Sequence, residues 1–356
     1  MSASTSEPAD VSLSEARELL VDLVSIPSPT REERKAAKRL VDFFEAHGRE
    51  VWIDAVGNVR APADDSVLLT SHIDTVPGDI PVEVEETGDD EVLWGRGSVD
   101  ATGPLAAMAA AAVRTGVSFV GVVGEEVDSK GSRYLVADRD DAPNAVVNGE
   151  PSGTDGITLG YRGLIAGTYV ATSESGHTSR PDPNAIQHAV RWWAGVEEQF
   201  EGGEYEPVFE QVTTKPVDIE GGVSEDGLSV EATMDVQLRV PPALDVETVR
   251  EAAEAELEVG TVTWKDKVPP VMMSPRTEVA RAFRVAIRKE GKEPRLVRKT
   301  GTSDMNIYAG AWDCPMVTYG PGNSDLDHAP DERLSLSEFD KSVAVLERVS
   351  RTLSEN

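Results

Sequence analysis

Residues 103–126 read GPLAAMAAAAVRTGVSFVGVVGEE, an alanine-rich stretch followed by a short apolar run that ends in two adjacent glutamates. The alanine-rich stretch predicts a helix, and the apolar run 118–124 predicts a buried strand. Similar apolar runs occur at 51–55 (VWIDA) and 66–74 (SVLLTSHID). Because buried strands alternate with helices here, we predict an α/β layer architecture with a mainly parallel sheet.

Two amphipathic helix patterns precede this region, at 15–25 and 31–48. Ser12 or Ser14 suits the cap of the first helix, which stops before the prolines of the segment IPSPT. Gly48 suits the residue just past the end of the second helix.

The pattern changes near Gly160, where two segments alternate like strands and a helical pattern lies between them. This combination predicts a compact α+β unit with antiparallel strands. We therefore predict two domains, one formed by 1–160 with 268–356 and the other an insert at 161–267. The length of 356 residues suits this division.

The chain is strongly acidic, with a formal net charge of −30 and 39% hydrophobic residues. This apolar content is enough for a sizeable core, and the negative charge argues against nucleic acid as a partner. The 34 basic residues comprise 10 Lys and 24 Arg. A diffuse acidic surface with few lysines is typical of proteins from a high-salt cytoplasm, although an ordinary acidic mesophilic enzyme is the alternative.

Cys314 is the single cysteine, so no intrachain disulfide can form and a reducing compartment is expected. The first residues have neither the basic nor the apolar region of a signal peptide. No apolar run reaches the length of a membrane span. We expect a cytoplasmic protein with no membrane partner.

Histidines are scarce enough to be weighed one by one: they are His47, His72, His177, His188 and His328. His47 ends a helix pattern and His188 lies within one, so we expect structural roles for both. The other three lie in segments rich in Gly, Ser or Asp beside apolar strand patterns.

Acidic and imidazole side chains follow three of the strand patterns, at HID, GEE and NGE. Open α/β sheets place ligands at the carboxyl ends of their strands. His72 and Asp74 are two residues apart and share a face in a strand, so the Asp74 carboxylate is expected beside the imidazole. A surface pair without a role is the alternative.

Glu125 and Glu126 are adjacent carboxylates that repel each other unless a cation compensates them. A metal ion can bind one while the other accepts a proton from water. By itself such a pair is common in acidic proteins. Asp100 and His328 lie in loops rich in turn-forming residues, and Glu150 follows a strand pattern.

Together five residues supply the mixture of nitrogen and oxygen donors that zinc accepts: His72, Asp100, Glu126, Glu150 and His328. Two Zn²⁺ ions carry four positive charges, which three carboxylates and one bridging hydroxide neutralise. Such a site suits a partly buried cleft.

Six motifs occur in a characteristic order: HIDTVPG (72–78), GRGSVDATGP (95–104), VVGEEVDSKG (122–131), NGEPS (148–152), GHTSRPD (176–182) and DLDHAPDE (325–332). Together they resemble the M20 family of co-catalytic metallopeptidases and deacylases, over nearly the whole chain after residue 12. The resemblance implies a zinc-peptidase-like catalytic domain that carries an inserted ferredoxin-like lid, through which the protein forms a homodimer.

Two zinc ions per subunit are implied, with cobalt or manganese as possible substitutes. One ion would bind His72, Asp100 and Glu150, and the other Asp100, Glu126 and His328, so that Asp100 bridges the pair. The resemblance also makes Asp74 the residue that orients His72 and Glu125 the general base.

His177 resembles the oxyanion-side donor that the family supplies from the other subunit. Arg239 resembles a lid arginine that binds a substrate carboxylate, with a surface arginine as the alternative. Gly301 and Thr302 lie in a turn that offers backbone N–H groups to substrate, and the neighbouring Asp304 would support the site or meet a substrate ammonium group. Thr102 departs from the family, which often has Lys there.

Four stretches are most similar to hydrolases that release lysine or ornithine from an acidic amino-group carrier protein in lysine and arginine biosynthesis: 95–101, 149–163, 299–306 and 319–332. The implied reaction is hydrolysis of the amide at the terminal glutamate of the carrier. A carrier substrate also predicts a docking surface near the cleft with basic side chains. The alternatives are a free N-acetylornithine or N-acetyllysine deacetylase, a dipeptidase, and a binding protein that has lost its metals.

Overall fold

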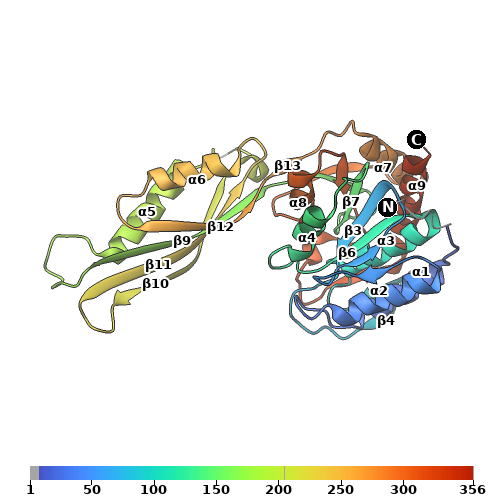
Figure 1. Ribbon diagram of the computed structural model, residues 1–356, viewed down its shortest axis with the longest axis horizontal. Coiled ribbons are helices and arrows are strands. Elements are labelled where there is room, and N and C mark those ends of the chain that lie inside the picture. Colours follow the sequence, from blue (N-terminus) through green and yellow to red (C-terminus); the bar gives the residue numbers. More distant parts are fainter. Residues whose placement is uncertain (1–7, 204, 356) are drawn as a thin grey trace. The chain divides into compact units, whose positions relative to one another are not determined.

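The computed structural model describes residues 8–203 and 205–355. The chain divides into two compact units (Figure 1). The first comprises Met1–Leu159, Met273–Val297 and Ile307–Asn356, and the second comprises Gly160–Met272 and Arg298–Asn306. The insert predicted at 161–267 lies inside the second unit, which also takes in a separate stretch from the carboxyl-terminal part of the chain.

The large sheet has the strand order β1-β2-β6-β3-β7-β15-β8-β13, with β14 paired to β8. Its strands are β1 (Trp52–Ile53), β2 (Val59–Ala61), β3 (Asp64–His72), β6 (Val117–Val122), β7 (Val146–Gly149), β8 (Gly156–Tyr161), β13 (Val271–Met272), β14 (Arg295–Lys299) and β15 (Met316–Thr318). The central strands β6, β3, β7 and β15 are parallel neighbours, whereas the pairs β1–β2, β2–β6, β15–β8 and β13–β8 are antiparallel. The predicted α/β class with a mainly parallel mixed sheet is confirmed.

The remaining helices outside the insert are α1 (Leu13–Val24), α2 (Arg34–Ala46), α3 (Thr102–Thr115), α4 (Lys130–Asp138), α7 (Glu278–Lys289), α8 (Asp304–Ala311) and α9 (Leu336–Ser354). The alanine-rich α3 is buried from its first residue to Val113, because small side chains let α1, α9 and β3 approach it closely. A small antiparallel sheet joins β4 (Glu83–Thr87), β5 (Asp90–Trp94) and β16 (Arg333–Ser335). Of the helices in the described ranges, none is long and apolar enough to cross a membrane.

The second unit contains a four-stranded antiparallel sheet in the order β10-β11-β9-β12. Its elements are β9 (Gly163–Glu174), α5 (Ala185–Gln199), β10 (Thr213–Val223), β11 (Ser229–Val240), α6 (Val246–Ala255) and β12 (Thr261–Val268). The chain order β-α-β-β-α-β and this strand order are those of a ferredoxin-like fold, as expected. Its core includes Trp192 of α5 stacked on Tyr169 of β9, with ring centroids 4.8 Å apart.

Candidate metal centre

The candidate metal ligands begin at the carboxyl edge of the parallel strands. His72 is the last residue of β3 and lies opposite Val122, the last residue of β6. Gly149 ends β7 opposite Ser71, so Glu150 follows at the same level. Because the three strands run in parallel and end together, their next residues meet at one edge of the sheet.

Asp100 reaches this edge from the loop that precedes α3, and the loop is anchored by Glu332. The Glu332 carboxylate accepts hydrogen bonds from the backbone N–H of Gly97 (3.0 Å), Val99 (2.9 Å) and Asp100 (3.1 Å). It also accepts one from the Arg96 guanidinium at 2.8 Å. Its side chain is 1% exposed. Glu332 therefore holds the backbone that carries Asp100, a role that the sequence did not predict.

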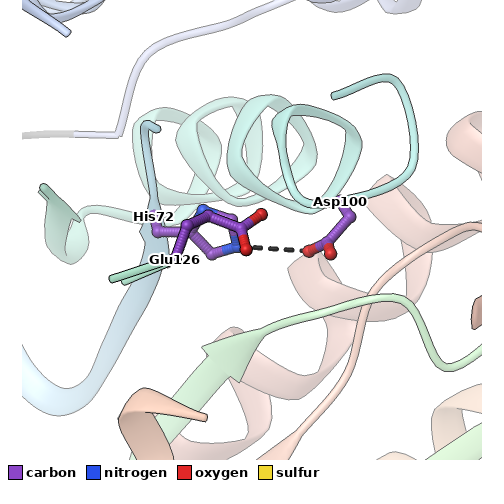
Figure 2. Close-up of side chains that lie close together, drawn as sticks. All are labelled: His72, Asp100 and Glu126. Carbon is purple, nitrogen blue, oxygen red and sulfur yellow. Dashed lines mark hydrogen bonds and ion pairs between the residues drawn. The ribbon is translucent and has the colours of Figure 1, made fainter. Parts of the chain in front are cut away.

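The Asp100 carboxylate faces one imidazole with each oxygen. Its Oδ1 lies 3.2 Å from Nε2 of His72, and its Oδ2 lies 3.1 Å from Nε2 of His328. Figure 2 shows Asp100, His72 and Glu126 converging from three separate segments of the chain. This is the arrangement expected of a carboxylate between two cations.

Glu126 and Glu150 complete the two groups of donors. Glu126 Oε2 lies 3.1 Å from Nε2 of His328, and Glu150 Oε1 lies 4.0 Å from Nε2 of His72. Two donors at ~2.0–2.2 Å from one tetrahedral zinc ion are roughly 3.3 Å apart, so this spacing fits. Single donor atoms of His72, Asp100 and Glu126 also lie within 4.8 Å of one another. Glu126 is therefore within reach of both groups.

The pKa values of the clustered side chains indicate a site that attracts cations. Burial lowers the pKa of His72, but the hydrogen bond to Asp100 and the charges of Glu150 and Glu125 outweigh it and hold the pKa well above its ordinary value. The hydrogen bond to Asp100 raises the pKa of His328 to about 9. Burial raises the pKa of Glu126 to about 6. Without metal the carboxylates retain protons on the imidazoles, and metal ions can replace these protons.

Asp74 lies beside His72 and makes its closer contact through the backbone carbonyl. Nδ1–H of His72 donates to the backbone carbonyl of Asp74 at 2.8 Å, while the Asp74 carboxylate lies 3.7 Å from that nitrogen. The carboxylate instead accepts the backbone N–H of Glu125 (3.1 Å) and of Glu126 (3.2 Å), and the Thr30 hydroxyl (2.8 Å). The contact with the carbonyl leaves Nε2 of His72 available to bind a metal ion, and the carboxylate fixes the turn that carries both glutamates.

His328 has a backbone φ of +61°. This left-handed conformation is uncommon for a residue other than glycine and is often found at functional sites. Its side chain is 51% exposed, compared with 11% for that of Asp100. Thr102 is the first residue of α3 and is buried beside the Asp100 loop, where its N–H donates to the Gly97 carbonyl at 2.9 Å.

Within the second unit, two of the predicted substrate-binding residues meet. The Arg239 guanidinium donates to the Thr302 hydroxyl at 3.2 Å, and Gly301 precedes that threonine. Arg162, which was not predicted, lies near enough to Arg239 for the two positive charges to interact, and burial lowers the pKa of both guanidinium groups. No ion pair among the described residues involves either arginine. His177 is exposed, and its Nδ1 lies 2.8 Å from the Ser179 hydroxyl.

Imidazole and carboxylate donors at the carboxyl edge of an α/β sheet, with a further glutamate beside them, make the site of a metal-dependent hydrolase. The chain belongs to peptidase family M20/M25/M40, whose family model matches residues 68–352. The resemblance seen in the sequence motifs is therefore confirmed.

The chain is also similar to individual proteins whose names are known. The chain is 40% identical over 352 residues to a [LysW]-lysine hydrolase of Deinococcus radiodurans, covering 93% of this chain and 95% of that protein. It is 31% identical to a [LysW]-lysine/[LysW]-ornithine hydrolase of Sulfurisphaera tokodaii, with 93% of each chain covered. Among solved structures, an M20 family metallo-carboxypeptidase of Sulfolobus solfataricus has a TM-score of 0.78 at 19% identity, over 96% of this chain and 100% of that one.

Proposed function

We propose that this chain is a two-metal amide hydrolase that releases lysine or ornithine from the terminal glutamate of an amino-group carrier protein. The observation that carries the proposal is the Asp100 carboxylate with an imidazole at each oxygen. The substrate is supported by the names of the Deinococcus and Sulfurisphaera relatives, which are similar over nearly their whole length.

Zinc is the proposed metal, with cobalt as a substitute, because the donor set is two imidazoles and three carboxylates. Two divalent ions at this site supply Lewis acidity toward a carbonyl and lower the pKa of water. His72, Asp100 and Glu150 form one ligand group, and Asp100, Glu126 and His328 form the other. The spacing of 3.1–4.0 Å between donors of one group supports this division.

Glu125 is the proposed general base. Its backbone is fixed by the Asp74 carboxylate, and its charge acts on the buried His72 imidazole. A carboxylate so close to the ligands can accept the proton of the attacking water and then deliver it to the leaving amine. Asp74 contributes by holding the turn in which Glu125 and Glu126 stand side by side.

The second unit is the proposed lid. Arg239, supported by Arg162, would bind a substrate carboxylate, since a guanidinium group without an acidic partner suits such a ligand. Gly301 and Thr302 would line the same site. His177 is proposed to donate to the developing oxyanion from the partner subunit of a homodimer.

Strand β10 supports the homodimer. It is an edge strand of the four-stranded sheet, and its last nine residues are exposed. Val217 and Ile219 are more than half exposed on this strand. An exposed edge strand is a template for pairing with another chain, and a second copy of this chain would cover the apolar side chains on β10.

We also propose a high-salt cytoplasm as the working environment. The support is the net charge of −30 and the ratio of arginine to lysine. Screening in concentrated salt removes much of the repulsion among surface carboxylates.

The test combines one variant with three substrates. Glu125→Gln should lower kcat by at least ~10²-fold while two zinc ions stay bound, because Gln cannot accept the proton and the ligands are unchanged. Full activity with full metal content would contradict the role of Glu125. Carrier-linked lysine, carrier-linked ornithine and N-acetyllysine should be compared with the wild-type protein. Preference for N-acetyllysine would favour a free deacetylase instead.

A further inference from the structure

A group of basic residues lies on α7 and on the residues just before and after it, in a chain that is otherwise strongly acidic. We name it the α7 basic surface, and it consists of Arg276, Arg281, Arg284, Arg288, Lys289, Lys292 and Arg295. Residues 276–295 contain these seven cations and three glutamates, a net charge of +4 in a chain that carries −30. Arg295 is paired with Asp155, and the charge of Lys292 acts on Asp155 and Glu338, so the unpaired positive charge lies mainly on α7 itself. The positive charge is therefore concentrated locally.

Four of the cations, Arg281, Arg284, Arg288 and Lys289, lie on α7 itself, on the side away from its buried residues. The opposite side of α7 is buried through Val279, Ala280, Ala282, Phe283, Ala286 and Ile287, and α7 lies against α9 (Figure 1). Arg281, Arg284 and Arg288 are three and four residues apart, so they form one stripe away from the core. Arg281, Arg288 and Lys289 are exposed.

In the described part of the chain no ion pair reaches Arg281, Arg288 or Lys289, and Glu290 is paired instead with Arg348 at 3.0 Å. Arg250 of α6 shows the contrasting arrangement, because it is paired with two glutamates of its own helix at 2.6 Å. Uncompensated positive charge of this kind attracts an acidic partner.

The α7 basic surface is joined to the loop that carries a metal ligand. Arg295 binds the Asp155 carboxylate with two hydrogen bonds of 2.8 and 3.0 Å, and its N–H donates to the Asp155 carbonyl at 2.8 Å. Asp155 follows Glu150 by five residues. A partner bound on the helix would therefore lie at the border of the loop that enters the metal centre.

We infer that the α7 basic surface is the docking site for an acidic protein, the carrier of the reaction proposed above, on which this inference rests. Arginine predominates over lysine in the surface, and guanidinium groups bind carboxylates in two-point contacts while being weakly hydrated. Such direct contacts persist in concentrated salt, where the Debye length falls to ~3 Å and long-range attraction is screened.

The test is charge reversal with a matched control. The triple variant Arg281→Glu, Arg288→Glu, Lys289→Glu is compared with Arg34→Glu, Lys35→Glu, Lys38→Glu, which reverses the same number of exposed cations on α2. Two substrates are used: the intact carrier linked to lysine, and a short carboxyl-terminal peptide of the carrier with the same linkage. Measurements are made at the lowest salt concentration at which the wild-type protein stays folded.

The triple variant should raise KM for the intact carrier about tenfold with kcat unchanged, and should leave KM for the short peptide as in wild type. The control should match wild type on both substrates. An unchanged KM for the intact carrier would overturn the docking site.

Binding of the unmodified carrier is measured alongside by titration calorimetry. If the wild-type protein hydrolyses neither substrate, the proposed function fails. In that case the docking site is still supported if the triple variant alone binds the carrier more weakly. Equal affinity of the wild-type protein, the triple variant and the control refutes it.

Discussion

Replacing Glu332 by Gln tests how the Asp100 loop is held. The carboxylate accepts four hydrogen bonds, three from backbone N–H groups and one from the Arg96 guanidinium. Gln keeps one acceptor oxygen and turns its amide N–H₂ toward the remaining donors. About two bonds to a charged acceptor are lost, at ~1.5–3 kcal/mol each. The variant should lose roughly 3–6 kcal/mol of stability, and part of this loss arises because Arg96 no longer has its buried anionic partner.

The same change should weaken metal binding, because Asp100 lies at the end of the loosened loop. Outer partners of metal ligands are typically worth about 10–100-fold in metal affinity. Denaturant titration measures the stability, and competition with a chelator measures the zinc affinity. The neighbouring Asp331→Asn is the control, since Asp331 is exposed and its ion pair within the described residues is with Arg333. Glu332→Gln protein with wild-type zinc affinity and stability would refute this account of the loop.

Three further outcomes are expected. In chelator-treated protein the raised pKa of His328 contributes stability that is complete below its ordinary value of 6.5 and is lost as the pH rises through about 9; Tm should fall across this window, and saturating zinc should remove the dependence. Arg239→Gln should raise KM about tenfold or more with less effect on kcat, because substrate loses a guanidinium partner; an unchanged KM would argue for a structural arginine. Ile219→Asp should shift the protein toward monomer in analytical ultracentrifugation, and an unchanged mass distribution would exclude β10 from the interface.

The candidate ligands at the strand ends were predictable from local pattern alone. A buried apolar run followed by a polar residue identifies His72, Glu126 and Glu150, and parallel pairing then brings them together. The start of α1 was also predictable from the sequence, since Ser12 caps this helix with Glu15 in a capping box. These features depend on residues a few positions apart.

Other parts of the site depend on contacts that local pattern does not contain. Alternation of side chains predicted the Asp74 carboxylate beside His72, and it lies 3.7 Å from Nδ1. Alternation did not show that the Asp74 carbonyl accepts the imidazole N–H, or that the carboxylate binds the turn of Glu125. Glu332 acts on a loop more than 230 residues earlier and looks like any other glutamate of an acidic chain. The feature of the sequence that could have pointed to Glu332 was its position four residues after His328.

The extent of the second unit was also incompletely predicted. Residues 298–306 lie far from the insert in sequence and include Thr302, which contacts Arg239. A hydrophobic pattern shows which side of an element is buried, but not against which distant element it packs.

Zinc stoichiometry of metal-free protein tests the central claim that Asp100 joins two metal ions in one site. Chelator-treated wild-type protein, His328→Ala and Asp100→Ala should be titrated with zinc, and the bound metal should be counted by elemental analysis after gel filtration. The account predicts two ions in wild type, one in His328→Ala and no tightly bound ion in Asp100→Ala. Two tightly bound ions in Asp100→Ala, or a fully active wild-type protein with a single ion, would contradict it.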